Sequence, residues 1–468
     1  MSDSSHNSPA SSASRRIQLL AHGPVPKTLF SLAAPAIAGM LVLAVYNVVD
    51  TVFVSFLRDT TAIAATGIVF PLFQLIGAVG LTFGMGAASV ISRRMGENKY
   101  KEAEQSGATA FYSSLAAGLL LSLIGAIFIE PILRVFGATD SIIAQGSLYG
   151  RIILGGSVFQ ILNMTLNNLL RSEGASLYSS MGQILGAVLN IILDPIFIFV
   201  LDMGITGAAV ATIIAQSVST AFLISFYLRG RGAINPLRPG SVRINLPTYR
   251  AIMALGAPTL VRQLLGSVSF GILNNAASAF GDAAIAAISV TMRIFMLLLM
   301  ALIGLAQGLQ PLVGYNYGSG NIPRVREGIR VVYITAALVG LVAGIIAMIF
   351  APGIMRFFAP QDPDVIRMGS MAMRYMAVVM VPTGLLLMFG GIFQALGDGR
   401  SAMILAAGQQ GGFLIPLVIF LPKVLGIHGV FLAQPAGFLF SFFIGLILIR
   451  KSSHALSKAE RELSAAAP

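Results

Sequence analysis

Two acidic residues lie inside long apolar stretches of this chain. Asp50 belongs to the segment YNVVDTVFVSF, and Asp194 belongs to NIILDPIFIF. An acidic side chain within the hydrocarbon layer of a membrane is costly, so it marks a functional site by default. Neighbouring carboxyl groups bind protons as a coupled pair, and carboxylate oxygens also suit a hard cation such as Na⁺. The alternative is that both acids only hydrogen-bond neighbouring helices.

Both acids are expected at the same depth. Each lies seven residues before the expected end of an outward-running helix, which places it about 10 Å inside the outer surface. Thr212 lies seven residues into the next helix, which returns through the same level. Asn190 precedes Asp194 by one helical turn and shares its face. Asp50, Asn190, Asp194 and Thr212 are therefore predicted to form one polar layer that couples a cation to transport.

Prolines accompany this layer. Pro195 directly follows Asp194, lacks a backbone donor and pushes against the carbonyl of Ile191. The freed carbonyl offers one more oxygen ligand, and the bend is a place where helix shape can change. Pro35 predicts a similar bend near the start of the apolar sequence. Both prolines also fit simple packing kinks that neighbouring helices satisfy.

The surrounding sequence is that of an integral membrane protein. Of the 468 residues, 56% are hydrophobic and 10% are charged, against roughly 25% charged in a soluble domain. Charge-free runs reach or approach the roughly 20 residues that a spanning helix needs. They predict about twelve transmembrane helices, at 28–49, 60–92, 105–129, 152–170, 174–193, 203–228, 263–281, 294–323, 331–355, 375–397, 401–422 and 424–449.

Basic residues set the expected orientation. When the connections are assigned alternately to two sides, 21 of the 30 Lys and Arg fall on the side of both termini, whereas the acids show no such bias. This pattern predicts that both termini are cytoplasmic in a multi-pass protein of the cell (inner) membrane. The net charge of +12 is then expected to contact anionic lipid and not nucleic acid. The polar, Ser-rich start predicts a disordered tail without a signal peptide.

The chain also repeats itself after about 222 residues. Ala34-Pro35 recurs as Ala257-Pro258, and Gly204-Ile205-Thr206-Gly207 recurs as Gly426-Ile427-His428-Gly429. Two six-helix bundles with the same orientation are predicted, related by a pseudo-two-fold axis along the membrane normal, an arrangement that suits alternating access. The expected parts are a tail (1–27), an N-terminal bundle (28–228), a linker (229–250), a C-terminal bundle (251–449) and a second tail (450–468). The second bundle lacks a deep acid, so ion coupling is assigned to the first.

Four motifs together resemble one family of transporters. YNVVDTVFVSF, RSEG at 171–174, NIILDPIFIF and GITGAAVAT at 204–212 resemble the multidrug and toxic compound extrusion (MATE) family. The missing deep acid in the second half resembles its DinF-type branch, which includes pumps of the MepA kind. The resemblance implies a V of two bundles and efflux of amphipathic, often cationic drugs in exchange for H⁺ or Na⁺. It also implies that Asp50, Asn190, Asp194 and Thr212 bind the cation, and that Asn163 and Asn167 line the substrate cavity.

Arg293 is the least expected residue, because it lies about nine residues inside a helix of the second half. It is assigned to the substrate cavity, where it would bind an anionic group or act on Asp50; bonding to carbonyl groups within its own half is the other interpretation. The 20 Met and 29 Phe suit an adaptable cavity, although most must pack or face lipid.

Other functions lack their motifs. The four His have no metal-ligand or triad spacing, the chain has no Cys, and no GxxxxGK[ST] is present. We therefore expect a monomeric transporter of small molecules that is not an enzyme and uses no metal or cofactor beyond its coupling ion. The alternatives are a flippase or exporter for a lipid-linked sugar or metabolite and, more remotely, an intramembrane enzyme.

Overall fold

The computed structural model describes residues 9–57, 59–360 and 362–466, and nearly all of them are helical. Twelve spans follow one another in two halves, as expected. The N-terminal half consists of α2 (Val25–Ser55), α3 (Thr60–Gly96), α4 (Tyr100–Val135), α5 (Asp140–Gly155) with α6 (Ser157–Ser172), α7 (Ser176–Pro195) with the π-helical η2 (Ile196–Val200), and α8 (Gly204–Leu228). The C-terminal half consists of α9 (Leu246–Ser278), α10 (Asp282–Gly318), α11 (Ile322–Phe358), α12 (Pro363–Val378) with α13 (Met380–Leu396), α14 (Gly399–Ala407) with η4 (Gly408–Phe413) and α15 (Leu414–Leu425), and α16 (Ile427–Ala466).

The helices are long and apolar enough to cross a membrane. Ten described helices or helical segments pass on length and composition alone, and two bent pairs bring the number to as many as 12. The pairs are α5 with α6, bent by 44°, and α12 with α13, bent by 54°. They occupy corresponding places in the two halves, so the duplication predicted from the sequence is also visible in the backbone. The predicted all-helical, two-bundle membrane fold is confirmed.

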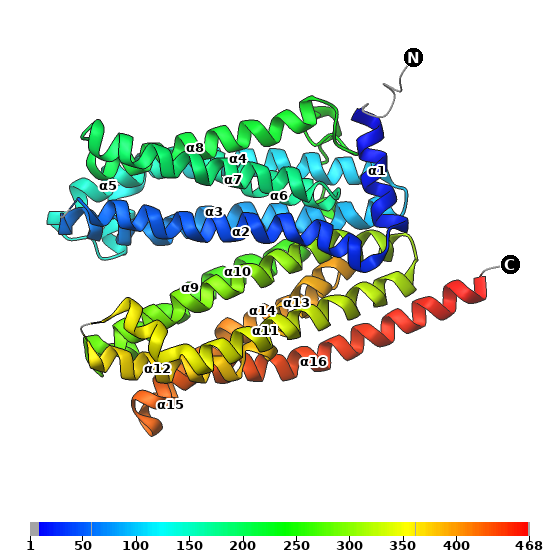
Figure 1. Ribbon diagram of the computed structural model, residues 1–468. Coiled ribbons are helices and arrows are strands. Elements are labelled where there is room, and N and C mark those ends of the chain that lie inside the picture. The colour runs from blue at the N-terminus through cyan, green and yellow to red at the C-terminus, as the bar shows by residue number, and fades with distance from the viewer. Residues whose placement is uncertain (1–8, 58, 361, 467–468) are drawn as a thin grey trace, which may run out of the picture.

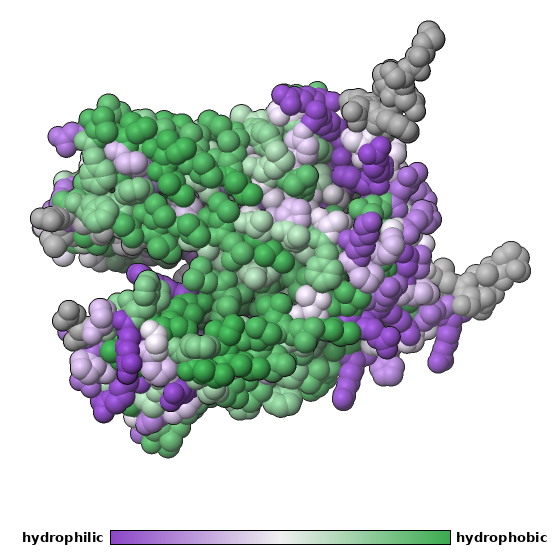
Figure 2. Space-filling view, in the orientation of Figure 1, coloured by the Kyte–Doolittle hydropathy of each residue, from purple (hydrophilic) through white to green (hydrophobic). Residues whose placement is uncertain are grey.

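The two halves meet on one side of the molecule and part on the other. Figure 1 shows them converging where α1 (Pro9–His22) and the end of α16 lie, a side that we call the termini side, and diverging toward the opposite side. Helix α2 packs on α10, and α3 packs on α9 and α10. Figure 2 shows the resulting groove, which opens opposite the termini side between largely hydrophobic walls.

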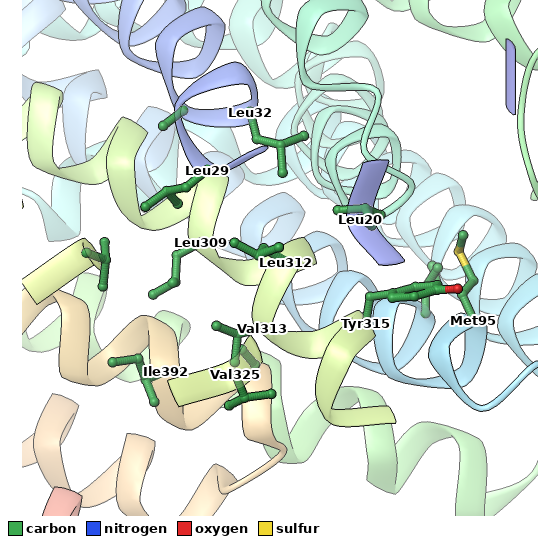
Figure 3. Packing of buried hydrophobic residues seen from close by; sticks show 14 of the residues in the cluster. Leu20, Leu29, Leu32, Met95, Leu309, Leu312, Val313, Tyr315, Val325 and Ile392 are labelled. Atoms are coloured by element: carbon green, nitrogen blue, oxygen red, sulfur yellow. The ribbon is translucent and has the colours of Figure 1, made fainter. Parts of the chain in front are cut away.

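Close helix approach holds the termini side together. A Cβ built on Gly304 of α10 would lie 2.6 Å from the Cα of Ile37 on α2, and one on Gly308 would lie 2.7 Å from the Cα of Ala33. Only glycine permits such backbone proximity. Beside these contacts lies a buried cluster that joins both halves (Figure 3), with Leu29 and Leu32 of α2 packed near Leu309 and Leu312 of α10.

Helix α1 differs from the expected disordered tail over 1–27. Leu20 is buried in the same cluster, and its carbonyl accepts a hydrogen bond of 3.0 Å from Nδ2 of Asn316. Nη2 of Arg324 donates to the carbonyl of Gly23 at 2.8 Å. The short apolar face of α1 finds a hydrophobic surface only where the two halves meet, which the sequence pattern does not reveal. Residues 1–8 of the predicted tail lie outside the described part.

The other end also differs from expectation, because α16 continues as a helix through most of the predicted tail 450–468. Leu456 is buried in the shared cluster, and Arg326 of α11 forms an ion pair of 2.9 Å with Glu460. Residues 467–468 lie outside the description. The linker 229–250 packs on the N-terminal half, with Ile234 buried and the backbone N–H of Asn235 donating to Glu104.

Candidate cation site and the groove

Three of the four predicted cation-site residues lie together in the interior of the N-terminal half. Asp194 is 0% exposed, and Asn190 and Thr212 are also buried. Nδ2 of Asn190 donates to Oδ1 of Asp194 and to Oγ1 of Thr212, both at 3.3 Å. Asn190 and Asp194 belong to α7, and Thr212 belongs to α8. The helical spacing that predicted this layer is thus matched by direct contacts across two packed helices.

Asp50 reaches the same place from α2. The carboxyl group of Asp50 interacts with that of Asp194. A carboxylate can only accept hydrogen bonds, so a bond between two carboxyl groups requires a proton on one of them. A proton shared by Asp50 and Asp194 would join them in this way, as the predicted cation site requires.

Two acceptors in this layer have no donor. Oδ1 of Asn190 and Oδ2 of Asp194 are buried without a hydrogen-bond partner in the described part of the chain. Burying a polar atom without a hydrogen-bond partner costs about 1–3 kcal/mol of folding free energy, so few such atoms occur in native folds and each needs a physical reason. Together with the Asp50 carboxyl and Oγ1 of Thr212 they present only oxygen, the ligand type that hard cations prefer.

The site also contains tyrosines that the sequence analysis did not single out. Tyr46 of α2 is buried, interacts electrostatically with Asp50 and Asp194, and is hydrogen-bonded to Thr212. Tyr149 of α5 interacts electrostatically with the same two acids. Tyr46 precedes Asp50 by one turn, a spacing that identifies it from sequence. Tyr149 has no such local signal, since α5 reaches the site only through the fold.

The predicted cavity residues Asn163 and Asn167 also lie in the interior of the N-terminal half. Both are buried on α6. Nδ2 of Asn163 donates to Oγ of Ser219 at 2.7 Å, and Nδ2 of Asn167 donates to Oδ1 of Asn163 at 2.8 Å. In this conformation the two amides bond within the N-terminal half and do not face the open groove. Their role in binding substrate stays a prediction.

Arg293 differs from both asparagines. Its side chain is exposed on α10, and it has no hydrogen bond or ion pair with any residue that the structure describes. The structure therefore shows no bonding of Arg293 to carbonyl groups of the described part of its own half.

Pro195 and Pro35 differ in the helical structure that surrounds them. Pro195 ends α7, and the π-helical turn η2 follows at once, with the N–H of Leu201 donating to the carbonyl of Ile196 at 2.9 Å. Such π-helical turns often occur at functional sites. The backbone therefore changes from α-helical to π-helical geometry directly after Pro195, the residue that follows Asp194. Pro35 lies within α2, which is assigned as one uninterrupted helix.

No group of three or more His, Cys, Asp or Glu that would hold a metal ion occurs among the described residues. The site instead has two carboxyl groups within one half of a duplicated, twelve-span fold, beside a groove that opens on one side only. These features define a membrane transporter built from two repeats.

Comparison with known proteins identifies the family. The MatE family model matches residues 35–196 and again 258–419, once in each half, and the chain belongs to this family of transporters, which are not enzymes. The multidrug export protein MepA of Staphylococcus aureus (strain MSSA476) is 27% identical over 407 residues, covering 87% of this chain and 89% of that protein.

Solved structures agree with this assignment. A multidrug resistance MATE family transporter of the MOP superfamily in an outward-facing conformation superposes with a TM-score of 0.89 at 27% identity, covering 94% of this chain and 98% of that one. A MOP superfamily transporter from Pyrococcus furiosus, described by the reverse polarity of its binding pocket, superposes with a TM-score of 0.88 at 27% identity over the same shares.

Proposed function

We propose that this protein exports amphipathic small molecules across the cell membrane in exchange for H⁺ or Na⁺. The observation that carries the proposal is the pairing of half-buried Asp50 with buried Asp194, with two unpaired oxygen acceptors in the same layer. The export of drugs by the relative MepA supports the direction and the substrate class. The excess of Lys and Arg on the termini side supports a cytoplasmic location for both termini, so the groove opens to the outside.

Cation binding acts on the N-terminal half. In the outward-open state the pair takes a cation from outside, either one proton shared between the carboxyl groups or Na⁺ held by carboxylate, amide and hydroxyl oxygens. A shared proton gives Oδ2 of Asp194 a partner, and Na⁺ gives one to both unpaired acceptors, so either cation favours a tighter arrangement of α2, α7 and α8. The π-helical turn after Pro195 is the segment that absorbs this change. Substrate leaves to the outside as the half tightens.

Alternation then requires the termini side to open. The glycine contacts of α10 with α2 are close and apolar, and together with the packing of α3 on α9 and α10 they connect the two halves. Parting at this seam, with closure of the groove on the opposite side, exposes the site to the cytoplasm. There the cation dissociates, because the cytoplasm holds less of it, and a new substrate enters.

The experiment is transport by purified protein in liposomes, with separate pH and Na⁺ gradients. Asp50→Asn and Asp194→Asn should abolish ion-driven export of a fluorescent dye while leaving the protein folded. Asp202→Asn is the matched control, because Asp202 is an exposed acid close after η2 whose positive φ asparagine tolerates. Export by wild type that neither gradient drives, or full export by both site variants, would overturn the proposal.

A further inference from the structure

We infer that the groove selects amphipathic molecules that carry an anionic group, and that Arg293 is the residue that binds this group. The inference rests on the proposed function and narrows its substrate class, which the sequence resemblance gave as often cationic. Carboxylate, sulfonate and phosphate groups all offer the oxygen pairs that a guanidinium group binds through two parallel hydrogen bonds.

The position of Arg293 on its helix turns it toward the groove. Gly304 and Gly308 mark the face of α10 that packs on α2. Arg293 precedes Gly304 by eleven residues, which is about three helical turns, so it lies on the same face. The buried residues Thr291 and Phe295 lie on the opposite face, toward the core of the C-terminal half. Arg293 is therefore exposed to the groove and not to lipid.

The helix across the groove is apolar at this level. Gly308 is opposite Ala33 and Gly304 is opposite Ile37, so the antiparallel pairing brings position 48 of α2 opposite Arg293. Ala33 is fully buried at the seam, whereas Val45 and Val48 are 54% and 52% exposed, because the helices have parted. A wall of valines across from one cation suits a molecule with an apolar body and a single negative group.

Asp50 does not neutralise this arginine. It lies two residues after position 48 and therefore on the far side of α2, where it interacts with Asp194 inside the N-terminal half. The described acids of the C-terminal half lie at helix ends or on the termini side, and none pairs with Arg293. Arg262 of α9, a half-buried arginine within another span, is also a cation and supplies no counter-ion. The groove thus carries a cation whose counter-ion the protein does not supply.

The test uses two dyes that differ in one charge: a rhodamine with a free carboxyl group and the ethyl ester of the same rhodamine. Binding to purified protein in nanodiscs of zwitterionic lipid is measured by fluorescence polarisation. Wild type should bind the carboxyl dye at least tenfold more tightly than the ester, since a hydrogen bond to a charged group contributes about that factor. Arg293→Gln should remove the preference, and Arg293→Lys should keep part of it.

Arg367→Gln is the control, because Arg367 of α12 is an exposed arginine whose charge is already paired with Asp364. A second arm adds anionic phospholipid to the nanodisc; competition with the carboxyl dye that depends on Arg293 identifies a lipid headgroup as the source of the anion, and absence of competition identifies the soluble amphiphile.

Equal binding of the two dyes by wild type, or an unchanged preference in Arg293→Gln, would overturn the inference. Ion-driven transport of the ester in that case leaves the proposed function standing. Failure of wild type to move either dye under any ion gradient would count against the proposed function itself, so the two failures are distinguishable.

Discussion

The seam between α2 and α10 yields the sharpest prediction, which concerns Gly308→Ala. The added Cβ would lie 2.7 Å from both the Cα and the N of Ala33, whereas non-bonded carbon atoms sit about 3.5–4.0 Å apart. The helices must therefore part by about 1 Å on the termini side. Because both partners are backbone atoms, no side chain can rotate away to relieve the contact.

The added Cβ destabilises only the conformation in which α2 and α10 are in contact on the termini side. Overpacking in a close-packed interface costs about 1–3 kcal/mol, which corresponds to a shift of roughly 5–150-fold in the equilibrium between the two conformations. Gly308→Ala should therefore move the population from the outward-open state toward the state that is open on the termini side. Gly67→Ala in α3 is the matched control, since a Cβ there meets nothing within 4 Å and the gain in helix propensity is the same.

The assay is a spin-label distance measurement across the termini side. The chain has no Cys, so cysteines placed at the exposed residues Arg229 and Arg400, one in each half, give a single labelled pair. Gly308→Ala should broaden and lengthen the distance distribution, and Gly67→Ala should leave it unchanged. A distribution in Gly308→Ala identical to that of the parent would refute the argument that glycine contacts hold this side closed.

Three further predictions concern the site, the linker and α1. Asn190→Leu should weaken ion-driven export by at least tenfold with little change in dye binding, since it removes the amide that bonds Asp194 and Thr212; equal losses in both assays would contradict a role in ion coupling. Burial raises the pKa of Glu173 to about 7, above a value of roughly 4.3 in the unfolded chain. Relative to Glu173→Gln, wild type should therefore lose folding stability on the order of 3 kcal/mol as pH rises from about 5 to 8. Calorimetric melting temperatures that change equally with pH in both proteins would exclude this effect. Leu20→Asp should release α1 from the joined halves and make it accessible to protease; unchanged protection would show that its contacts do not hold it.

The cation site was predictable because helices are regular. Counting residues from helix ends placed Asp50, Asp194 and Thr212 at one depth, and the one-turn spacing placed Asn190 beside Asp194. The contacts observed among these side chains follow from that geometry, whereas their role in ion coupling stays a prediction. Tyr149 was not predictable, because it reaches the acids through the packing of α5, which no local spacing encodes.

Elements held in place by the contact between the two halves could not be predicted from the sequence either. Helix α1 is too short and too polar to read as a stable helix alone, and it is held by Leu20, Asn316 and Arg324 only where the two halves meet. The same limit applies to Asn163, whose amide was expected in a cavity and is bonded to Ser219 in the interior. Sequence spacing gives the face of a helix on which a residue lies, but not which neighbour covers that face in a given conformation.

Infrared difference spectroscopy reports directly whether Asp50 and Asp194 share a cation. We expect a carboxylic-acid C=O stretch in wild type that disappears when Na⁺ or alkaline buffer replaces the shared proton. This stretch should be lost in Asp50→Asn and Asp194→Asn and should persist in Asp202→Asn. A stretch that survives in both site variants, or that is absent from wild type at every pH, would contradict it.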